Sequence, residues 1–198
     1  LLVVMGVTGA GKSTIGAALA RALGVAFVEG DDFHPPENRA RMAAGIPLTD
    51  ADRAGWLQAL AAQLAQAHAD GRGLVVSCSA LKRSYRDVLR AAAPVRFVFL
   101  DGDRALIAER LDRRAGHFMP PALLDSQFAT LEAPTPDEEA WRLDVATPPD
   151  EIALEVVALV VRASTTSSAS ADSQARFRPF SRSTSRAEPI LTTSLRAW

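Results

Sequence analysis

The stretch Gly6-Val7-Thr8-Gly9-Ala10-Gly11-Lys12-Ser13 decides the fold of this chain. It matches the pattern GxxxxGK(S/T) at every defined position, and it stands between the apolar run Leu1–Met5 and the Ala- and Leu-rich segment Ser13–Leu23. The order is that of a buried strand, a glycine-rich loop and a helix ending at Gly24, which is the context that a phosphate-binding loop requires. The backbone N–H groups of such a loop point inward at the positive end of the helix, where they bind phosphate oxygens.

The side chains of this loop predict binding of ATP and Mg²⁺. Lys12 is expected to contact the β- and γ-phosphates, and the Ser13 hydroxyl is expected to bind the magnesium ion. The alternative is a glycine-rich turn without a ligand, which the presence of both Lys and Ser at the motif positions disfavours. The predicted ATP-binding residues in this segment are Gly6, Thr8, Gly9, Ala10, Gly11, Lys12, Ser13 and Thr14.

The rest of the chain alternates between strand and helix patterns. Thr49 and Asp52 form a capping-box pattern at the start of a long helix. Asp103 and Pro121 mark the starts of two further helices. The other predicted elements are strands 25–29, 74–77, 95–100 and 143–145 and helices 83–92 and 152–161. Strands that alternate with helices predict an α/β fold with a mostly parallel, doubly wound sheet.

Length and charge limit the kind of protein. The 198 residues suffice for one domain with a full core. Residues 163–198 contain 14 Ser or Thr and no sustained periodicity, so we predict a globular body of residues 1–162 and a disordered tail of residues 163–198. The tail has five Arg against one Asp and one Glu, whereas the whole chain has a net charge of −1, so the body is acidic. Binding to nucleic acid needs a basic face, and we therefore expect none.

The single cysteine, Cys78, excludes an intrachain disulfide and is consistent with a reducing compartment. It has no activating histidine near it in the sequence, so we expect a small core residue rather than a nucleophile. The chain has no run of about 18 apolar residues, and its first residues lack a basic region and a cleavage site. We therefore expect neither a membrane-spanning helix nor a signal peptide, and a cytoplasmic protein.

A cluster of carboxylates follows the second predicted strand, where Val25–Glu29 leads directly into Gly30-Asp31-Asp32-Phe33-His34. Ligands of open α/β sheets bind beyond the carboxyl ends of the strands, so we expect these carboxylates opposite the γ-phosphate. One of them could accept the proton of an attacking hydroxyl, and another could hold magnesium-bound water. The alternative is a solvated acidic turn, which the placement at a strand end disfavours.

Six segments along residues 1–162 carry a family resemblance: GVTGAGKST, GDDFHPPENRARM, GIPLTDADRAGWL, SCSALKRSYRDVLR, RLDRRAGHFMP and LLDSQFATLE. Together they closely resemble the gluconokinase family, the small ATP:gluconate 6-phosphotransferases akin to shikimate kinase. Many families share the first segment, whereas the GDxxHP, CSALKxxYRD and RxGHF elements are far more specific. The resemblance implies a P-loop kinase αβα sandwich with a five-stranded parallel sheet, a helical lid at about residues 110–130 and, in many members, a homodimer.

The resemblance also implies a reaction, the transfer of the ATP γ-phosphoryl group to the 6-hydroxyl of D-gluconate. Asp31 matches the position of the family's base carboxylate, Asp32 is the second choice, and Glu29 could orient magnesium-bound water. Two alternatives stay open. One is another small-molecule kinase of this fold, such as shikimate kinase, and the other is a nucleotide-binding regulator without transfer chemistry.

A pocket for gluconate needs cations at the carboxylate end and hydrogen-bonding groups along the polyol. The candidate cations are Arg53, Lys82 and Arg86, and the candidate polyol contacts are His34, Asn38 and Gln127. Each has an ordinary alternative. Arg53 could form a surface ion pair, Lys82 and Arg86 could lie on a solvated helix face, and His34 could be a turn residue.

Arginines gather near the end of the helix that Asp103 begins, where Arg110, Arg113 and Arg114 precede the segment 116–118. A phosphoryl-transfer lid needs such cations to neutralise the transferring group, whereas the alternative is cations that complement the helix dipole. The resemblance places Arg110 near the nucleotide, Arg114 on the phosphates and His117 near the acceptor, so the predicted catalytic residues are Lys12, Asp31 and Arg114. By position, residues 144–149 are expected to form the adenine-side loop.

Overall fold

The computed structural model describes residues 1–113 and 121–175. Contacts divide the chain into two compact units, Leu1–Val161 and Arg162–Trp198. The elements are β1 (Leu2–Met5), α1 (Lys12–Leu23), β2 (Ala26–Glu29), η1 (Gly30–Phe33), α2 (Pro36–Ala43), α3 (Asp50–Ala69), β3 (Leu74–Ser77), α4 (Arg83–Ala92), β4 (Arg96–Asp101), α5 (Arg104–Asp112), α6 (Pro121–Thr130), η2 (Pro136–Glu138), β5 (Trp141–Asp144) and α7 (Pro149–Ala175).

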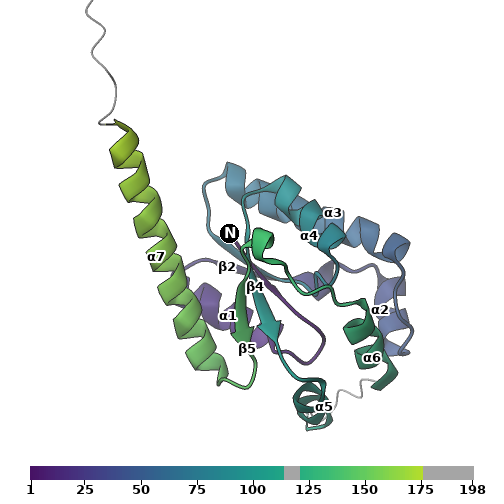
Figure 1. Cartoon of the computed structure of the whole chain (residues 1–198). Helices are drawn as coiled ribbons and strands as arrows, with labels where there is room; N and C mark the ends of the chain where they lie inside the picture. Colours follow the sequence, from purple (N-terminus) through teal and green to yellow (C-terminus); the bar gives the residue numbers. More distant parts are fainter. Residues whose placement is uncertain (114–120, 176–198) are drawn as a thin grey trace, which may run out of the picture. The chain divides into compact units, whose positions relative to one another are not determined.

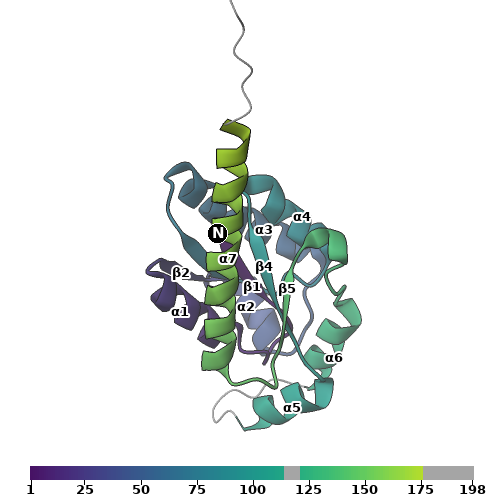
Figure 2. The same ribbon diagram turned by 60° about the vertical axis from the view of Figure 1, so that its left-hand side comes forward.

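One sheet contains the five strands in the order β2-β3-β1-β4-β5, and each neighbouring pair is parallel (Figures 1 and 2). This confirms the predicted α/β class with a five-stranded parallel sheet. β1 lies at the centre, with β2 and β3 on one side of it and β4 and β5 on the other. Ligands of such sheets bind where the strand order reverses, so the loop after β1 begins at the expected ligand site.

Alternate residues of the strands face two layers of helices. Leu2 and Val4 of β1 pack with residues of α1 and the start of α7. Val3 and Met5 of the same strand pack with residues of α3 and α4. Figure 1 shows α3 and α4 together on one side of the sheet. A strand buried on both faces explains why its sequence is a continuous apolar run rather than an alternating one.

The predicted helix boundaries are confirmed where a side chain or a glycine marks them. The Asp52 N–H donates to Thr49 Oγ1 at 3.2 Å, and the Thr49 N–H donates to Asp52 Oδ2 at 2.7 Å, which completes the capping box of α3. The Ala105 N–H donates to Asp103 Oδ1 at the start of α5. Gly24 ends α1 with a φ of +65°, in the left-handed region that favours glycine.

Two elements differ from the sequence-based expectation. The segment with Pro35 and Pro36, for which the sequence analysis predicts no helix, contains α2, because Pro36 occupies its first turn, where no N–H is needed. The last strand spans Trp141–Asp144 rather than 143–145. It lies at the edge of the sheet and contains Arg142 and Asp144, so its sequence lacks the apolar run that marks a central strand.

The last helix also differs, because α7 continues to Ala175 instead of ending at Val161. The first part of the predicted tail, residues 163–175, thus lies in this helix, and residues 176–198 lie outside the described residues. The Ala and Ser that alternate through this stretch are compatible with a helix, although they give it no apolar stripe. No helix within residues 1–113 and 121–175 combines the length and the apolar character of a membrane span.

A buried ion pair ties α4 to the segment before β5. Arg86 donates from Nε to Glu138 Oε2 at 2.6 Å and from Nη2 to Oε1 at 2.7 Å, and both side chains are 1% exposed. Arg90 donates to the same carboxylate at 2.9 Å. The hydrogen bonds from Arg86, assisted by Arg90, lower the pKa of Glu138 to about 2, against the opposing effect of burial.

Glu138→Gln should lower the free energy of unfolding by about 3–5 kcal/mol at neutral pH, because it leaves the Arg86 charge buried without its counter-ion. The folded pKa of Glu138 lies below its ordinary value of 4.5, so the carboxylate stabilises the fold above that pH and loses this contribution as the pH falls toward 2. Urea unfolding of both proteins from pH 7 to pH 3 measures the difference. The gap should narrow below about pH 4, and a constant gap would contradict the role given to this carboxylate.

Candidate active site

The phosphate loop lies between the carboxyl end of β1 and the first turn of α1. Gly9 and Gly11 have φ angles of +79° and +96°, which favour glycine. Gly11 is the N-cap of α1, so the loop lies at the positive end of the helix dipole, and the first turn contains no acidic residue. Lys12 Nζ donates to the Val7 carbonyl at 2.9 Å, which keeps the ammonium group against the loop. This arrangement is suited to binding phosphate oxygens.

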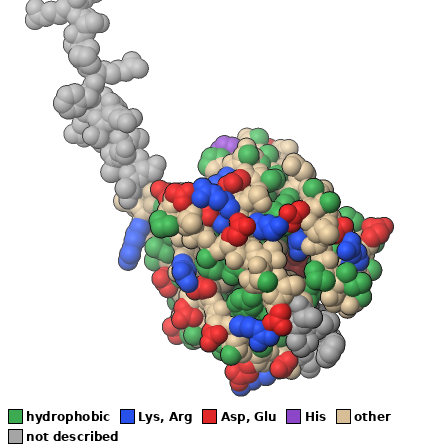
Figure 3. Space-filling model, turned by 45° about the vertical axis from the view of Figure 1, so that its right-hand side comes forward, with side chains coloured by type: hydrophobic (Ala, Val, Ile, Leu, Met, Phe, Trp, Pro, Cys, Tyr) green, Lys and Arg blue, Asp and Glu red, His purple; other side chains and the backbone are tan. Residues whose placement is uncertain are grey.

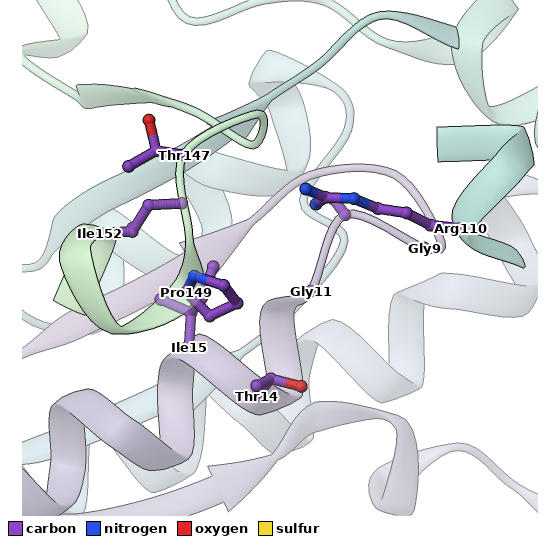
Figure 4. Close-up of a pocket in the computed structure, with 9 residues that line it drawn as sticks. Gly9, Gly11, Thr14, Ile15, Arg110, Thr147, Pro149 and Ile152 are labelled. Atoms are coloured by element: carbon purple, nitrogen blue, oxygen red, sulfur yellow. The ribbon is translucent and has the colours of Figure 1, made fainter. Parts of the chain in front are cut away.

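A cavity of about 350 Å³ lies beside the phosphate loop. Arg110 of α5 extends toward Gly9 and Gly11, and its Nη2 donates to the Val145 carbonyl at 2.5 Å (Figure 4). Thr147 lies in the loop before α7, where its N–H donates to the Asp144 carbonyl at 3.1 Å and closes a turn. The residues that line the cavity are Gly9, Ala10, Gly11, Thr14, Ile15, Arg110, Thr147, Pro149 and Ile152. Its position next to the loop suits the base and sugar of a nucleotide, and Thr147 and Pro149 of the segment 144–149 border it.

A second, narrower cavity of about 70 Å³ brings together residues that are far apart in the sequence. Six of the predicted site residues border it: Thr8, Lys12, Asp31, His34, Arg53 and Gln127. The remaining lining residues are Met42, Leu48, Ser79, Leu81 and Leu123. Asp31 borders this cavity, whereas its neighbour Asp32 is not among the lining residues. The cavity joins the phosphate loop to a carboxylate and a guanidinium, which is the arrangement that an acceptor site needs. We call it the acceptor cavity.

His34 is 5% exposed and stacks on Trp56, with the ring centroids 4.2 Å apart and the planes at 14°. Its Nδ1 has no hydrogen-bond partner among the described residues. Burial lowers the pKa of His34, and Arg53 and Arg39 lower it further, while Asp31 opposes them. The imidazole is therefore neutral at pH 7, with one ring nitrogen able to accept a hydrogen bond.

Gln127 and Arg53 make contacts that set the edges of the acceptor cavity. The Thr8 N–H donates to Gln127 Oε1 at 2.7 Å, which links α6 to the phosphate loop. Arg53 Nη1 donates to the Leu48 carbonyl at 2.5 Å, and its guanidinium lies 5.8 Å from the centre of the Tyr85 ring. The arginine therefore does not pair with Asp50 or Glu37 among the ion pairs described, and it borders the cavity instead.

Lys82 and Asn38 lie away from the acceptor cavity. Lys82 Nζ donates to both carboxylate oxygens of Asp50 at 2.8 Å and lies 5.6 Å from the centre of the Tyr85 ring. Asn38 Nδ2 donates to the Asp52 carbonyl at 2.7 Å, and this buried side chain thereby joins α2 to α3. Neither is among the residues that border the cavity. The role of Lys82 as a cation for the substrate and that of Asn38 as a polyol contact therefore stay predictions.

Arg86 requires a correction. The residue is completely buried, and its guanidinium donates to the Glu138 carboxylate and to the backbone carbonyls of Ala80, Leu81 and Glu132. Because the guanidinium is completely buried and does not border the acceptor cavity, the structure does not place it against a substrate carboxylate as expected. The side chain stabilises the loop after β3, where Ala80 has an unusual positive φ of 43°. Leu81 of this loop borders the acceptor cavity, so Arg86 supports one of the residues that line it.

The groups predicted to bind magnesium are oxygen donors of the kind that Mg²⁺ prefers. The Ser13 side chain is exposed in the first turn of α1. The Glu29 carboxylate accepts a hydrogen bond from the Ser77 hydroxyl, which fixes its position at the end of β2. No group of three or more potential metal ligands occurs within the described part of the chain, so a resident metal site built from protein side chains alone is not found there. This pattern fits an ion held by one or two side chains together with phosphate oxygens and water.

Part of the predicted lid lies outside the described residues. Arg114, Gly116 and His117 belong to the segment 114–120. On either side of that segment, α5 and α6 are helical, and Arg113 pairs with Glu109 at 2.5 Å on the exposed face of α5. Among the described arginines of the predicted lid, Arg110 thus lines the cavity beside the phosphate loop.

Sequence reasoning missed Trp56, Ser77 and Ser79. Trp56 belongs to the apolar face of α3, and an amphipathic pattern treats it as a core residue. Ser77 and Ser79 lie at the carboxyl end of β3, where the placement rule for parallel sheets draws attention to polar residues. Cys78 between them is buried, and burial raises the pKa of its thiol to about 12, which confirms the predicted core residue.

The fold and the phosphate loop define a P-loop phosphotransferase. A family model described as an AAA domain matches residues 1–134. The chain is 50% identical over 157 residues to a gluconokinase of Gluconobacter oxydans strain 621H, which covers 79% of this chain and 88% of that protein. It is 47% identical over 145 residues to the thermosensitive gluconokinase of Escherichia coli K12, covering 72% of this chain and 78% of that one. The crystal structure of a gluconokinase from Sinorhizobium meliloti 1021 has a TM-score of 0.77 at 50% identity, and the match covers 83% of this chain and 93% of that chain. The chain therefore belongs to the gluconokinase family.

Lys12→Ala should reduce ATP-dependent phosphoryl transfer by at least about two orders of magnitude, because the γ-phosphate loses its cation as the bond breaks. A coupled assay of ADP release measures the rate. Arg21→Ala, at the exposed far end of α1, is the matched control and should keep the wild-type rate. Near-wild-type kcat in the Lys12 variant would show that the loop does not bind the transferring phosphate as described.

Proposed function

We propose that this chain acts as an ATP-dependent gluconokinase, which transfers the γ-phosphoryl group to the 6-hydroxyl of D-gluconate and releases 6-phosphogluconate and ADP. The observation that supports this best is the acceptor cavity, which combines Arg53, Asp31 and His34 next to Lys12. A linear polyol with one carboxylate offers groups that match a guanidinium and hydrogen-bonding side chains. Relatives that are 47–50% identical over most of the chain are gluconokinases, which favours this reaction over shikimate phosphorylation or a regulatory role.

Asp31 is the proposed general base. It takes the proton of the 6-hydroxyl as that oxygen forms its bond to the γ-phosphorus, and the bond between the γ-phosphorus and the β–γ bridging oxygen breaks with its electron pair leaving on ADP. Asp31 is favoured over Asp32 because it borders the acceptor cavity together with Lys12. Lys12 neutralises charge on the phosphates during the transfer.

Mg²⁺ supplies charge neutralisation on the β- and γ-phosphates when it is bound. The Ser13 hydroxyl is its proposed protein ligand, and Glu29 is proposed to orient a water of its shell. The support for this is the exposed position of Ser13 at the start of α1 and the fixed carboxylate of Glu29. Both residues supply the oxygen atoms that the ion prefers.

Gluconate binding is proposed to use Arg53 for the carboxylate and His34 and Gln127 for the polyol. The neutral imidazole of His34 can accept a hydrogen bond from a hydroxyl, and burial makes that bond selective. Gln127 borders the cavity, and the hydrogen bond that it accepts from the Thr8 N–H holds its amide beside the phosphate loop.

The remaining expectations stay proposals with more general support. Arg114 and His117 are proposed to complete the site from the lid at about residues 110–130, with Arg110 beside the nucleotide. The kinase domain is proposed to span residues 1–162, so that a chain ending at Arg162 should keep the activity of the full chain.

Lys and Arg side chains lie interspersed with Asp and Glu on the face shown in Figure 3, which supports a protein that does not bind nucleic acid. A cytoplasmic, membrane-free protein that forms a homodimer agrees with the family resemblance.

A panel of acceptors tests the proposed reaction. Steady-state ADP release is measured with ATP and Mg²⁺ in the presence of D-gluconate, other sugar acids or shikimate. We expect D-gluconate to give the highest kcat/KM, and phosphorus NMR of the product should show a phosphate on the 6-position. Equal rates with and without an acceptor would instead support an ATPase or a regulator, and a preference for shikimate would support the other kinase.

Asp31→Asn should lower kcat for gluconate by about two to four orders of magnitude with a smaller change in KM, because a general base acts mainly in the transition state. Asp32→Asn is the matched control, with the same change one residue away and outside the acceptor cavity. This variant should keep kcat within about threefold of wild type, because a carboxylate outside the cavity does not act as the general base. If Asp32→Asn loses activity while Asp31→Asn keeps it, the roles of the two carboxylates are exchanged.

A further inference from the structure

Gly30, which joins β2 to the turn containing Asp31, lies unusually close to β3. Its N–H donates to Ser77 Oγ at 3.0 Å, and a Cβ built on it would lie 2.0 Å from the Ser77 carbonyl oxygen. Only glycine fits at this distance, although the φ of Gly30 is an ordinary one. The backbone that leads into Asp31 is therefore fixed against the sheet from one side.

Trp56 of α3 fixes the same turn from the other side. The indole is 1% exposed, and its Nε1–H donates to the Gly30 carbonyl at 2.7 Å. The ring of the same residue stacks on His34 at 4.2 Å. The Trp56 side chain thus contacts Gly30, directly before Asp31, and His34, directly after the end of η1.

Filling the core does not by itself account for Trp56. The cluster around it is built from apolar residues such as Leu57, Leu60 and Phe99, and a phenylalanine could occupy much of the same space. A buried indole N–H needs an acceptor, and the one that it finds is a backbone carbonyl next to the proposed base. The stacking also turns the His34 ring so that this residue borders the acceptor cavity.

We propose that Trp56 is a positioning residue for the transfer reaction: its N–H holds the turn that places Asp31, and its ring holds the imidazole of His34. This proposal rests on the proposed function of Asp31 and His34. Geometry of this kind influences the rate because a base displaced by about 1 Å loses up to about a hundredfold in effective reactivity.

Two substitutions separate the two contacts. Trp56→Phe keeps a ring for the stacking and removes the N–H donor, so kcat should fall about ten- to a hundredfold while KM for gluconate and for ATP stays within about threefold. Trp56→Leu removes both contacts and should also raise KM for gluconate. Leu64→Ala is the control, since Leu64 is fully buried in the same apolar cluster two turns later in α3. It should lower the melting temperature but keep kcat.

A double substitution supplies a readout that a purely structural role would not change. If Trp56 acts by placing Asp31, Trp56→Phe should have little further effect on kcat in the Asp31→Asn background. Independent, multiplying effects would overturn the proposal, as would a Trp56→Phe variant with wild-type kcat or a Leu64→Ala variant with an equal loss. Where Trp56→Phe does not fold, Trp56→Tyr, which keeps a ring and lacks the indole N–H, takes its place, and a wild-type kcat in that variant overturns the proposal. Failure of the wild type to phosphorylate gluconate, in contrast, would refute the proposed function and not the contact itself.

Discussion

The Arg86 guanidinium forms five hydrogen bonds, and these join the loop after β3 to the segment between α6 and β5, which lies far from it in the sequence. They hold the carbonyls of Ala80 and Leu81 after β3, the carbonyl of Glu132 after α6, and the carboxylate of Glu138 before β5. An arginine suits this position because its planar group offers five N–H donors in fixed directions. The strained backbone of Ala80 persists because this network determines it from several sides. One wall of the acceptor cavity depends on the network, since Leu81 belongs to that wall.

The acceptor cavity concentrates opposite charges in a chain whose net charge is only −1. Asp31, Arg53 and Lys12 border it together with the neutral ring of His34. Burial favours the neutral form of that imidazole, and the nearby arginines add to the effect. Under the proposed function, the substrate carboxylate would meet the guanidinium of Arg53 without a competing positive imidazole, and a hydroxyl would meet His34 as an acceptor. Charge at one end of the cavity and hydrogen bonding at the other would then distinguish the two ends of a sugar acid.

The sequence predicts the framework well where one local signal is sufficient. The phosphate loop, the Thr49 capping box and the sheet class all follow from patterns within a few residues of each other, and the structure confirms them. Local patterns do not show which residues pair when they lie far apart in the sequence. Arg86 is taken as a candidate substrate cation because its partner Glu138 lies 52 residues away, and the role of Trp56 is missed because Gly30 lies 26 residues away. The helical end of α7 is missed for another reason, since its Ser- and Thr-rich composition is typical of disordered segments.

Cys78 connects this architecture to thiol chemistry. It is the one cysteine of the chain, and it is 1% exposed. It lies between Ser77, which accepts a hydrogen bond from the Gly30 N–H, and Ser79, which borders the acceptor cavity. A thiol with a pKa of about 12 is scarcely ionised at neutral pH and out of contact with solvent, so an alkylating reagent reacts with it only after the end of β3 has opened. The labelling rate of the unmodified chain is thus a measure of how often the carboxyl end of β3, next to the acceptor cavity, opens. A ligand that binds only the closed form slows that rate in proportion to its occupancy, without any introduced probe.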